Sequence, residues 1–227
     1  MASKAHLKIL KQGVAAWNRW RQEKSHIVPD LSNENIFKLG LASTNFSRSD
    51  FAGVNFHGTY LHVFDLSSAD FKKADLSEAN LTSSDLRGAD IRGANLAGVD
   101  LKRANLSSVD ISGARLSGAD FSEANLNGVN LNGVDFSEAN FSRVDFTGVD
   151  LSKAILRNAH LEGANLSEVN LFGKNLSDAD LREADLRKAN LREANLNRTD
   201  LSGSDLTGAQ IYRATRYEWR IDGIRCD

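Results

Sequence analysis

The sequence predicts an all-β solenoid, a rod in which one short structural unit is stacked on copies of itself. The first observation is a five-residue period, because every fifth residue from Leu31 to Ile211 is Leu, Phe or Ile, which makes 37 consecutive units. The second is that this period fits neither the turn of an α-helix nor the alternation of a β-strand. The third is that so short a unit cannot bury its own apolar residue, so neighbouring copies must cover it.

Each unit is predicted to point two apolar residues inward and three polar residues outward, as the segment 74–78 (Ala-Asp-Leu-Ser-Glu) illustrates. We call the Leu, Phe or Ile the central residue. The residue two before it is almost always small, and the residue just before it, the pre-central residue, is mostly Asp or Asn. Asn, Asp, Ser and Gly favour turns, since their side chains bond the backbone locally or tolerate positive φ.

Two residues, Phe64 and Lys174, break the rule that the position two before the centre is small. A lysine ammonium group that is forced into an apolar core carries a large desolvation cost. We therefore expect the wall of the rod to bulge at Lys174 and its amine to reach water.

The pattern A-[DN]-[LF]-x-x, found for example at 79–81, 119–121 and 184–186, resembles the pentapeptide repeat family. The resemblance covers about 180 of the 227 residues. It implies a right-handed β-helix of quadrilateral cross-section with four units, or about 20 residues, in each coil. The whole repeat would then make about nine coils. Uninterrupted repeats of this kind also imply a bacterial source, with cyanobacteria as the typical one.

The uninterrupted repeat predicts one β-helix domain over 30–211, with short ends at 1–29 and 212–227. The net charge of −2 is unevenly divided: +5 in residues 1–29, −8 in 30–211 and +1 in 212–227. One cysteine, Cys226, cannot form an internal disulfide, which fits a reducing compartment. The polar N-terminus lacks the apolar core of a signal peptide, and no apolar stretch is long enough to span a membrane. These observations favour the cytoplasm.

The N-terminal segment predicts one amphipathic helix over residues 4–22, with Ser3 as its N-cap. Its apolar face consists of Leu7, Leu10, Val14, Trp17 and Trp20. Its opposite face is basic, with Lys4, Lys8, Lys11 and Arg19. We expect the helix to cap the rod, because an uncovered end exposes unpaired backbone and apolar side chains. The alternative is a basic amphipathic helix that binds a membrane surface or a partner protein.

The C-terminal segment 212–227 is an aromatic and apolar run. It could fold over the last coil as a cap. It could instead form half of an end-to-end homodimer, as the resemblance implies, because family members that act on DNA enzymes dimerise through this region. A third reading is that it begins a segment truncated from this chain.

Nothing in the sequence predicts catalysis, a cofactor or a metal. The regular rod offers no concave pocket, and there is no glycine-rich phosphate loop and no cysteine cluster. His57 and His62 occupy equivalent outward positions in successive units, so they are expected on neighbouring sides of a convex rod, where ligands do not converge on a metal. We therefore expect a non-enzymatic protein.

Two surface features are candidate contact sites. Residues 20 apart should stack on one side of the rod, which predicts an acidic ladder of Asp30, Asp50, Asp70, Asp90 and Asp110. The second feature is a cluster in which aromatic and apolar residues replace the usual polar ones, and exposed clusters of this kind are typical of protein contacts. It comprises Phe37, His57, Tyr60, His62 and Val63.

The leading interpretation is a non-enzymatic, cytoplasmic scaffold that binds another protein along its side or at its end. The alternative, which the resemblance implies, is a DNA mimic that binds DNA gyrase or topoisomerase IV and inhibits it or protects it from quinolones. Neither interpretation involves direct binding to nucleic acid.

Overall fold

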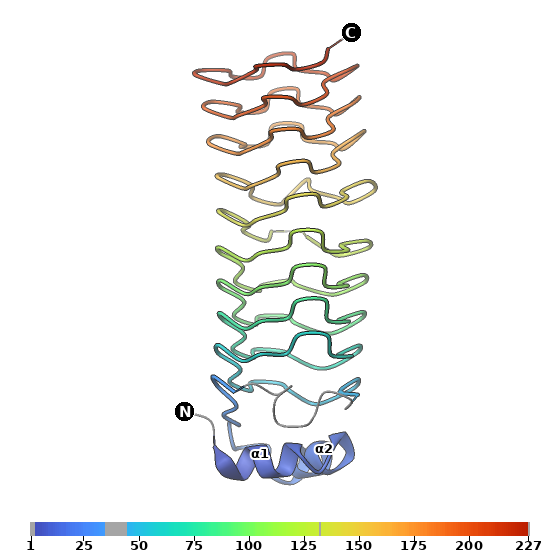
Figure 1. Ribbon diagram of the computed structural model, residues 1–227, viewed down its shortest axis with the longest axis vertical. Coiled ribbons are helices and arrows are strands. Elements are labelled where there is room, and N and C mark those ends of the chain that lie inside the picture. Colours follow the sequence, from blue (N-terminus) through green and yellow to red (C-terminus); the bar gives the residue numbers. More distant parts are fainter. Residues whose placement is uncertain (1–2, 35–44, 132, 227) are drawn as a thin grey trace.

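The chain forms a rod of stacked coils with two short helices lying across its N-terminal end (Figure 1). The computed structural model describes residues 3–34, 45–131 and 133–226. The helices are α1 (Lys4–Leu10) and α2 (Val14–Glu23). Within these described ranges, no helix has the length and apolar character needed to cross a membrane.

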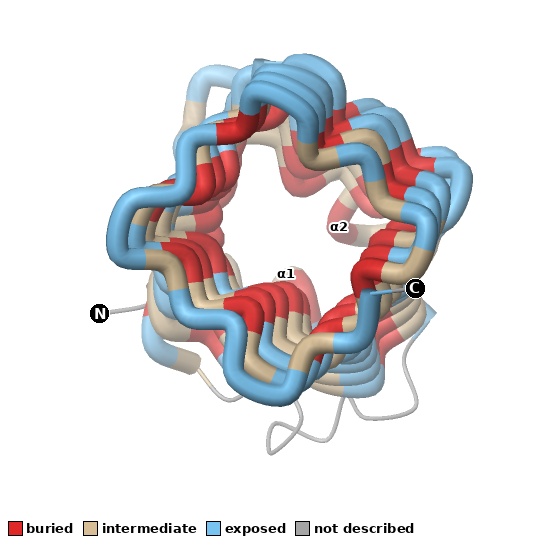
Figure 2. The backbone as a smooth tube through the Cα atoms, turned by 90° about the horizontal axis from the view of Figure 1, so that it is seen from above, coloured by how far each residue is buried: buried red, intermediate tan, exposed pale blue. Residues whose placement is uncertain are grey.

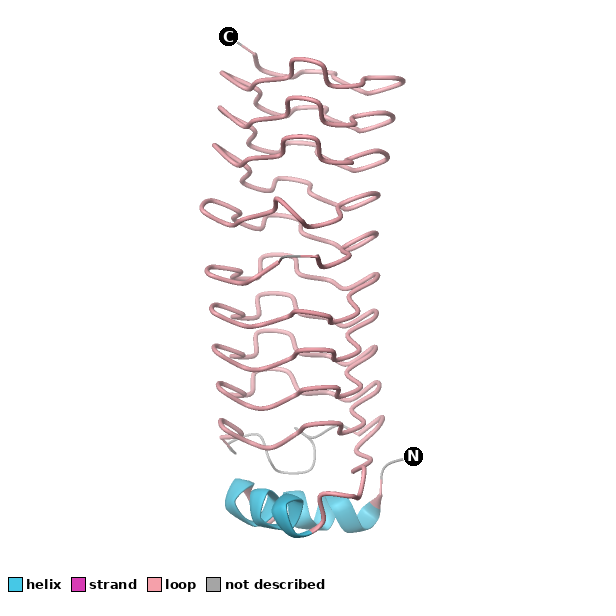
Figure 3. Ribbon diagram, turned by 180° about the vertical axis from the view of Figure 1, so that it is seen from behind, coloured by secondary structure: helices cyan, strands magenta, loops and turns pink. Residues whose placement is uncertain are grey.

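The coils repeat every 20 residues. Parallel bridges join pre-central residues of successive coils, from Asp50 with Asp70 to Asp205 with Arg225. The amide of a central residue donates to a pre-central carbonyl of the next coil, as Leu76 N does to Asn95 O at 2.7 Å. Because each unit contributes a single bridge, the described residues form no longer strand, and Figure 3 draws the rod as loop. Seen along its axis, the tube is four-sided (Figure 2).

The turn between walls explains why Asp and Asn recur before the central residue. Oδ1 of Asp75 accepts a hydrogen bond from the backbone N–H of Ser77 at 3.1 Å. The chain then reverses: Ala79 N donates to Leu76 O at 3.1 Å, and Glu78 has a φ of +56°. This left-handed conformation costs a non-glycine residue about 1–2 kcal/mol, and glycine avoids that cost at the equivalent position of the coils that use it.

The central residues fill the core, and all described ones from Phe46 to Leu206 are buried. Phenylalanine rings stack between coils, for example Phe121 on Phe141 with 5.1 Å between centroids. Phe64 occupies a position that is otherwise small, yet it is only 2% exposed. It fits because Ser84, at the equivalent position one coil later, is small and leaves room for the ring.

Lys174 differs in part from its prediction. No bridge joins Ile155 to Asn175 within the described residues, so the expected opening of the wall is present. The amine, however, does not extend into water: Nζ donates to the carbonyls of Ser152 at 2.5 Å and Ala154 at 3.1 Å. Burial lowers the pKa of Lys174, and the charge of Asp150 partly opposes that shift. The ammonium therefore takes the place of a backbone donor between two coils.

The N-terminal segment forms two helices where one was predicted. Gly13 breaks the helix, with a φ of +92° that a continuous α-helix cannot contain. The predicted apolar face is still directed at the rod: Leu10 and Trp17 are buried, and the other three pack against the core while partly exposed, namely Leu7, Val14 and Trp20. The break lets both helices lie across the end of the rod (Figure 1).

The coil does not stop at residue 211, which corrects the predicted boundary. Bridges continue on three walls, pairing Asn195 with Thr215, Asp200 with Arg220, and Asp205 with Arg225. The five-residue apolar pattern ends because Arg216 stands at the next central position, where it is exposed. Pairing survives because it uses backbone groups, which do not depend on the side chain at the centre.

Candidate interaction surfaces

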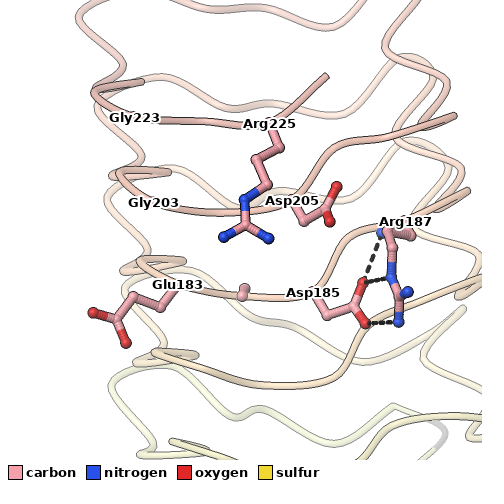
Figure 4. Close-up of a pocket in the computed structure, with 8 residues that line it drawn as sticks. Glu183, Asp185, Arg187, Gly203, Asp205, Gly223 and Arg225 are labelled. Atoms are coloured by element: carbon pink, nitrogen blue, oxygen red, sulfur yellow. Dashed lines mark hydrogen bonds and ion pairs between the residues drawn. The ribbon is translucent and has the colours of Figure 1, made fainter. Parts of the chain in front are cut away.

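The walls of the rod hold only shallow, open depressions in the part that the structure describes. A larger one, of about 630 Å³, is shown in Figure 4. Its charged groups are already engaged across their own turn, because the Arg187 guanidinium donates to Asp185 at 2.5 and 2.8 Å. Among the described residues, no three His, Cys, Asp or Glu side chains converge on a possible metal position.

Tyr60, His62 and Val63 come together as predicted in sequence. With Asn80 and Thr82 of the next coil they line a depression of about 390 Å³, and we call this set the Tyr60 patch. Tyr60 is 47% exposed and Val63 55% exposed, although equivalent positions elsewhere hold polar residues or glycine. Val63 also adopts a φ of +59°, which is unfavourable for a β-branched residue. An apolar side chain held on the surface at such a cost suggests a binding role.

The other two members of the predicted cluster do not join the Tyr60 patch. His57 does not line the depression: its Nδ1 lies 3.0 Å from Ser77 Oγ, and its Nε2 lies 3.9 Å from Glu78. Phe37 lies outside the described residues. The candidate contact surface is therefore smaller than the sequence suggested.

Asp30 does not belong to the acidic ladder, which corrects the predicted register. Asp30 pairs with Asn55, 25 residues later, instead of with Asp50. The edge below Asp50 is occupied by α2: Trp17 Nε1 donates to Asp50 O at 2.8 Å, and Asn18 Oδ1 accepts from Asp50 N at 2.9 Å. Side chains of a helix thus replace the coil that would have carried Asp30 in the ladder.

The remaining four ladder residues, Asp50, Asp70, Asp90 and Asp110, are stacked as predicted but are largely paired with cations. Lys72 bridges two of them, with Nζ 2.9 Å from Asp70 and 3.4 Å from Asp90. Arg92 contacts Asp90 at 2.7 Å and Asp110 at 3.8 Å, and Arg21 lies 3.6 Å from Asp50. The hydrogen bonds from Arg92 lower the pKa of Asp90 to about 2. The ladder is therefore close to neutral.

Comparison with known proteins identifies the repeat. The family model described as pentapeptide repeats matches eight copies, at residues 41–62, 65–103, 84–122, 104–143, 145–173 and 175–210. The chain belongs to the pentapeptide repeat family. The right-handed quadrilateral β-helix of this family agrees with the 20-residue coils described above.

Several solved pentapeptide repeat proteins are similar to this chain. HetL from the cyanobacterium Nostoc sp. strain PCC 7120, involved in heterocyst differentiation regulation, is 29% identical over 86% of each chain, with a TM-score of 0.48. A second Nostoc protein is 29% identical over 51% of this chain and 92% of its own, with a TM-score of 0.33. QnrB1, a plasmid-mediated fluoroquinolone resistance protein, is 21% identical over 87% and 84%, with a TM-score of 0.29. No curated protein sequence matches the chain.

This pentapeptide repeat protein carries a second apolar strip that sequence analysis did not single out. Phe172, Arg192 and Tyr212 are 20 residues apart and so follow one another on one wall, with Phe172 45% and Tyr212 66% exposed. Arg192 has Asn190 instead of Asp two residues before it, and in the described structure it forms no ion pair. The spacing of 20 and the missing aspartate were the signals available in the sequence.

The last coil of this pentapeptide repeat protein partly covers its own end. Trp219, at a position that is otherwise small, packs against the core, and the Arg216 guanidinium lies 5.4 Å from its ring centroid. Trp219 and Ile224 line a depression of about 270 Å³ with Leu206 and Ile211. The outward side chains of Tyr212 and Tyr217 remain exposed.

Proposed function

We propose that this chain is a non-enzymatic scaffold that binds another protein through the Tyr60 patch. The observation that carries the proposal is the exposure of Tyr60 and Val63, at 47% and 55%, beside His62 on a wall that is otherwise polar. Large aromatic side chains that lose their water in a contact provide much of the binding free energy of protein interfaces. The bridged wall beneath them holds both side chains at a fixed spacing, which lowers the entropic cost of binding.

Affinity capture of partners from the native cell tests this proposal. The protein is compared with a double variant, Tyr60→Ala with Val63→Ser, which removes the exposed apolar groups and leaves the core unchanged. The matched control is Tyr212→Ala with Ile155→Ser, which removes similar exposed groups from other walls. A partner that is lost with the first variant and kept by the control supports the proposal. Equal capture by both variants contradicts it.

The second candidate function is that of a DNA mimic that binds DNA gyrase or topoisomerase IV, in inhibition or in quinolone protection. Its support is the net charge of −8 over residues 30–211. The neutralised ladder counts against it, because Lys72 and Arg92 compensate three of the four stacked carboxylates.

A gyrase supercoiling assay distinguishes the second function from the first. The variant carries Asn at Asp50, Asp70, Asp90 and Asp110. Asparagine keeps the side-chain oxygen that accepts the turn hydrogen bond, so the coil should remain folded. The matched control carries Asn at Asp100, Asp120, Asp180 and Asp200 on another wall. Inhibition or quinolone protection that only the ladder variant loses would support the DNA mimic.

The ends of the rod have proposed roles as well. We infer that residues 1–29 form a cap over the first coil, and that the chain acts either as a monomer or as an end-to-end homodimer through 212–227. The uncovered aromatic groups of Tyr212 and Tyr217 support the dimer, whereas the packing of Trp219 over the core supports a complete cap. Sedimentation of Tyr217→Ser beside the unaltered chain decides between them. A bacterial cytoplasm as its location stays a prediction.

A further inference from the structure

The outer face of α1 and α2 is strongly basic. Its exposed charged residues are Lys4, Lys8, Lys11, Arg19, Glu23 and Lys24, and we call this set the basic end face. The two helices lie flat across the end of the rod with Leu10 and Trp17 buried on the inner side (Figure 1). The exposed residues are thus left for contacts outside the chain.

The cations of the basic end face have no carboxylate partner in the part of the chain that the structure describes. This differs from the walls, where cations are paired with nearby acids. Lys72 lies 2.9 Å from Asp70, and Arg182 lies 2.6 Å from Asp180. Five positive charges and one negative charge therefore face water at one end of a rod whose walls compensate their own charges.

The basic end face is also unfavourable for the helix that carries much of it. Lys4 lies in the first turn of α1, which contains no acidic residue, so its charge meets the positive end of the helix dipole. Lys4 and Lys8 are four residues apart on one helix face, where like charges repel. A sequence that breaks local rules in this way is expected to gain a compensating contact elsewhere.

We propose that the basic end face binds the surface of an anionic phospholipid bilayer, so that the rod stands on its N-terminal end. The surface is flat and dominated by lysine, and lysine ammonium groups act as point charges toward phosphates without requiring a fixed geometry. Clusters of four to eight basic residues on helices bind anionic lipid in this manner. The net charge of −8 on residues 30–211 would be repelled by the same surface, which favours the end-on orientation.

The buried aromatic residues favour a bilayer over nucleic acid and exclude deep insertion. Trp17 is fully buried, and Trp20 packs against it with 5.4 Å between ring centroids, so neither ring is presented for stacking on bases. The apolar face of both helices is spent on the core, which leaves electrostatic attraction as the binding force. Binding should therefore weaken steeply with salt.

Co-sedimentation of the full chain with vesicles tests the proposal, using phosphatidylcholine alone and phosphatidylcholine mixed with phosphatidylglycerol. We expect binding to the anionic vesicles only, and only at low salt. Each lysine near a charged membrane contributes about a five-fold factor, so Lys4→Gln/Lys8→Gln/Lys11→Gln should bind roughly 100-fold more weakly. The matched control, Lys73→Gln/Lys102→Gln/Lys153→Gln, makes the same change in net charge on the walls and should bind as the unaltered chain does.

Three results would overturn the proposal: no binding to anionic vesicles at low salt, equal loss in both triple variants, or binding to duplex DNA with no binding to vesicles. Loss of fold is a separate matter that a third variant resolves. Replacing the three lysines of the basic end face by arginine keeps the charge and should keep the binding. None of these outcomes depends on the Tyr60 patch.

Discussion

The side chain of Arg21 connects the N-terminal helices to the first coils, and its removal tests whether α2 stabilises the rod. Arg21 is 8% exposed. Its guanidinium donates to the carbonyls of Ala52 at 2.6 Å and Ile27 at 3.1 Å, and its Nε lies 3.6 Å from the Asp50 carboxylate. In Arg21→Ala both carbonyls and the carboxylate lose their cation.

The expected cost follows from these contacts. A hydrogen bond from a charged group contributes about 1.5–3 kcal/mol. Both carbonyls lie in partly buried surroundings, so water can replace part of each bond. We expect Arg21→Ala to lower the free energy of unfolding of the N-terminal end by about 3 kcal/mol. With a urea dependence of about 2 kcal/mol per molar, the transition midpoint should fall by roughly 1–2 M.

The assay is urea unfolding followed by tryptophan fluorescence in a Trp219→Phe background, so that Trp17 and Trp20 report on the N-terminal end alone. This local probe is needed because the ends of a solenoid can unfold separately. The matched control is Arg19→Ala on the exposed side of α2, which should change the free energy by less than about 0.5 kcal/mol. Equal midpoints for Arg21→Ala and Arg19→Ala would refute the idea that α2 stabilises the first coil.

Three further predictions concern the coils. Leu161→Ala empties a fully buried central position and should cost about 2–5 kcal/mol in urea unfolding followed by circular dichroism; Leu206→Ala, near the open end, should cost less, and the reverse order would contradict the core description. Lys174→Ala should raise the melting temperature, because it removes a partly buried charge and lets the amide of Asn175 reach the carbonyl of Ala154; a lower melting temperature would show that the ammonium bonds outweigh burial. Because the pKa of Asp90 is lowered from 3.8 to about 2, its stabilising effect should be complete above pH 4 and lost between pH 4 and 2, by at most about 2 kcal/mol; Asp90→Asn should remove that part of the acid sensitivity in unfolding measured against pH.

The side that each residue presents could be predicted from the sequence because the period alone determines it. Once the unit is five residues and the coil is 20, the central residue must point inward and the pre-central residue must face the turn. The burial of Leu76 and the turn bond of Asp75 follow from that register. The exposure of Tyr60 and Val63 follows as well, since both stand at outward positions.

The ends of the rod could not be predicted in the same way, because there no copy of the unit dictates the neighbour. Asp30 was assigned by counting, but α2 occupies the place below Asp50, so Asp30 pairs with Asn55. Gly13 was compatible with a weakened continuous helix, and only the geometry of the rod's end shows that the chain must break there. Pairing beyond residue 211 was hidden because Arg216 interrupts the apolar period without interrupting the backbone ladder.

The regular coils make most of this surface self-sufficient, so binding should depend on departures from the repeat. Asp185 with Arg187 and Asp90 with Arg92 form ion pairs within single turns, and such pairs present little net charge to a partner. The Tyr60 patch leaves apolar groups without cover, and the basic end face leaves cations without acids. If each site acts alone, the Tyr60 patch variants should leave vesicle binding unchanged, and the lysine variants should leave capture of a protein partner unchanged. Together the two sites would hold a protein partner at a set height above a membrane, because the coils between them are joined by backbone hydrogen bonds.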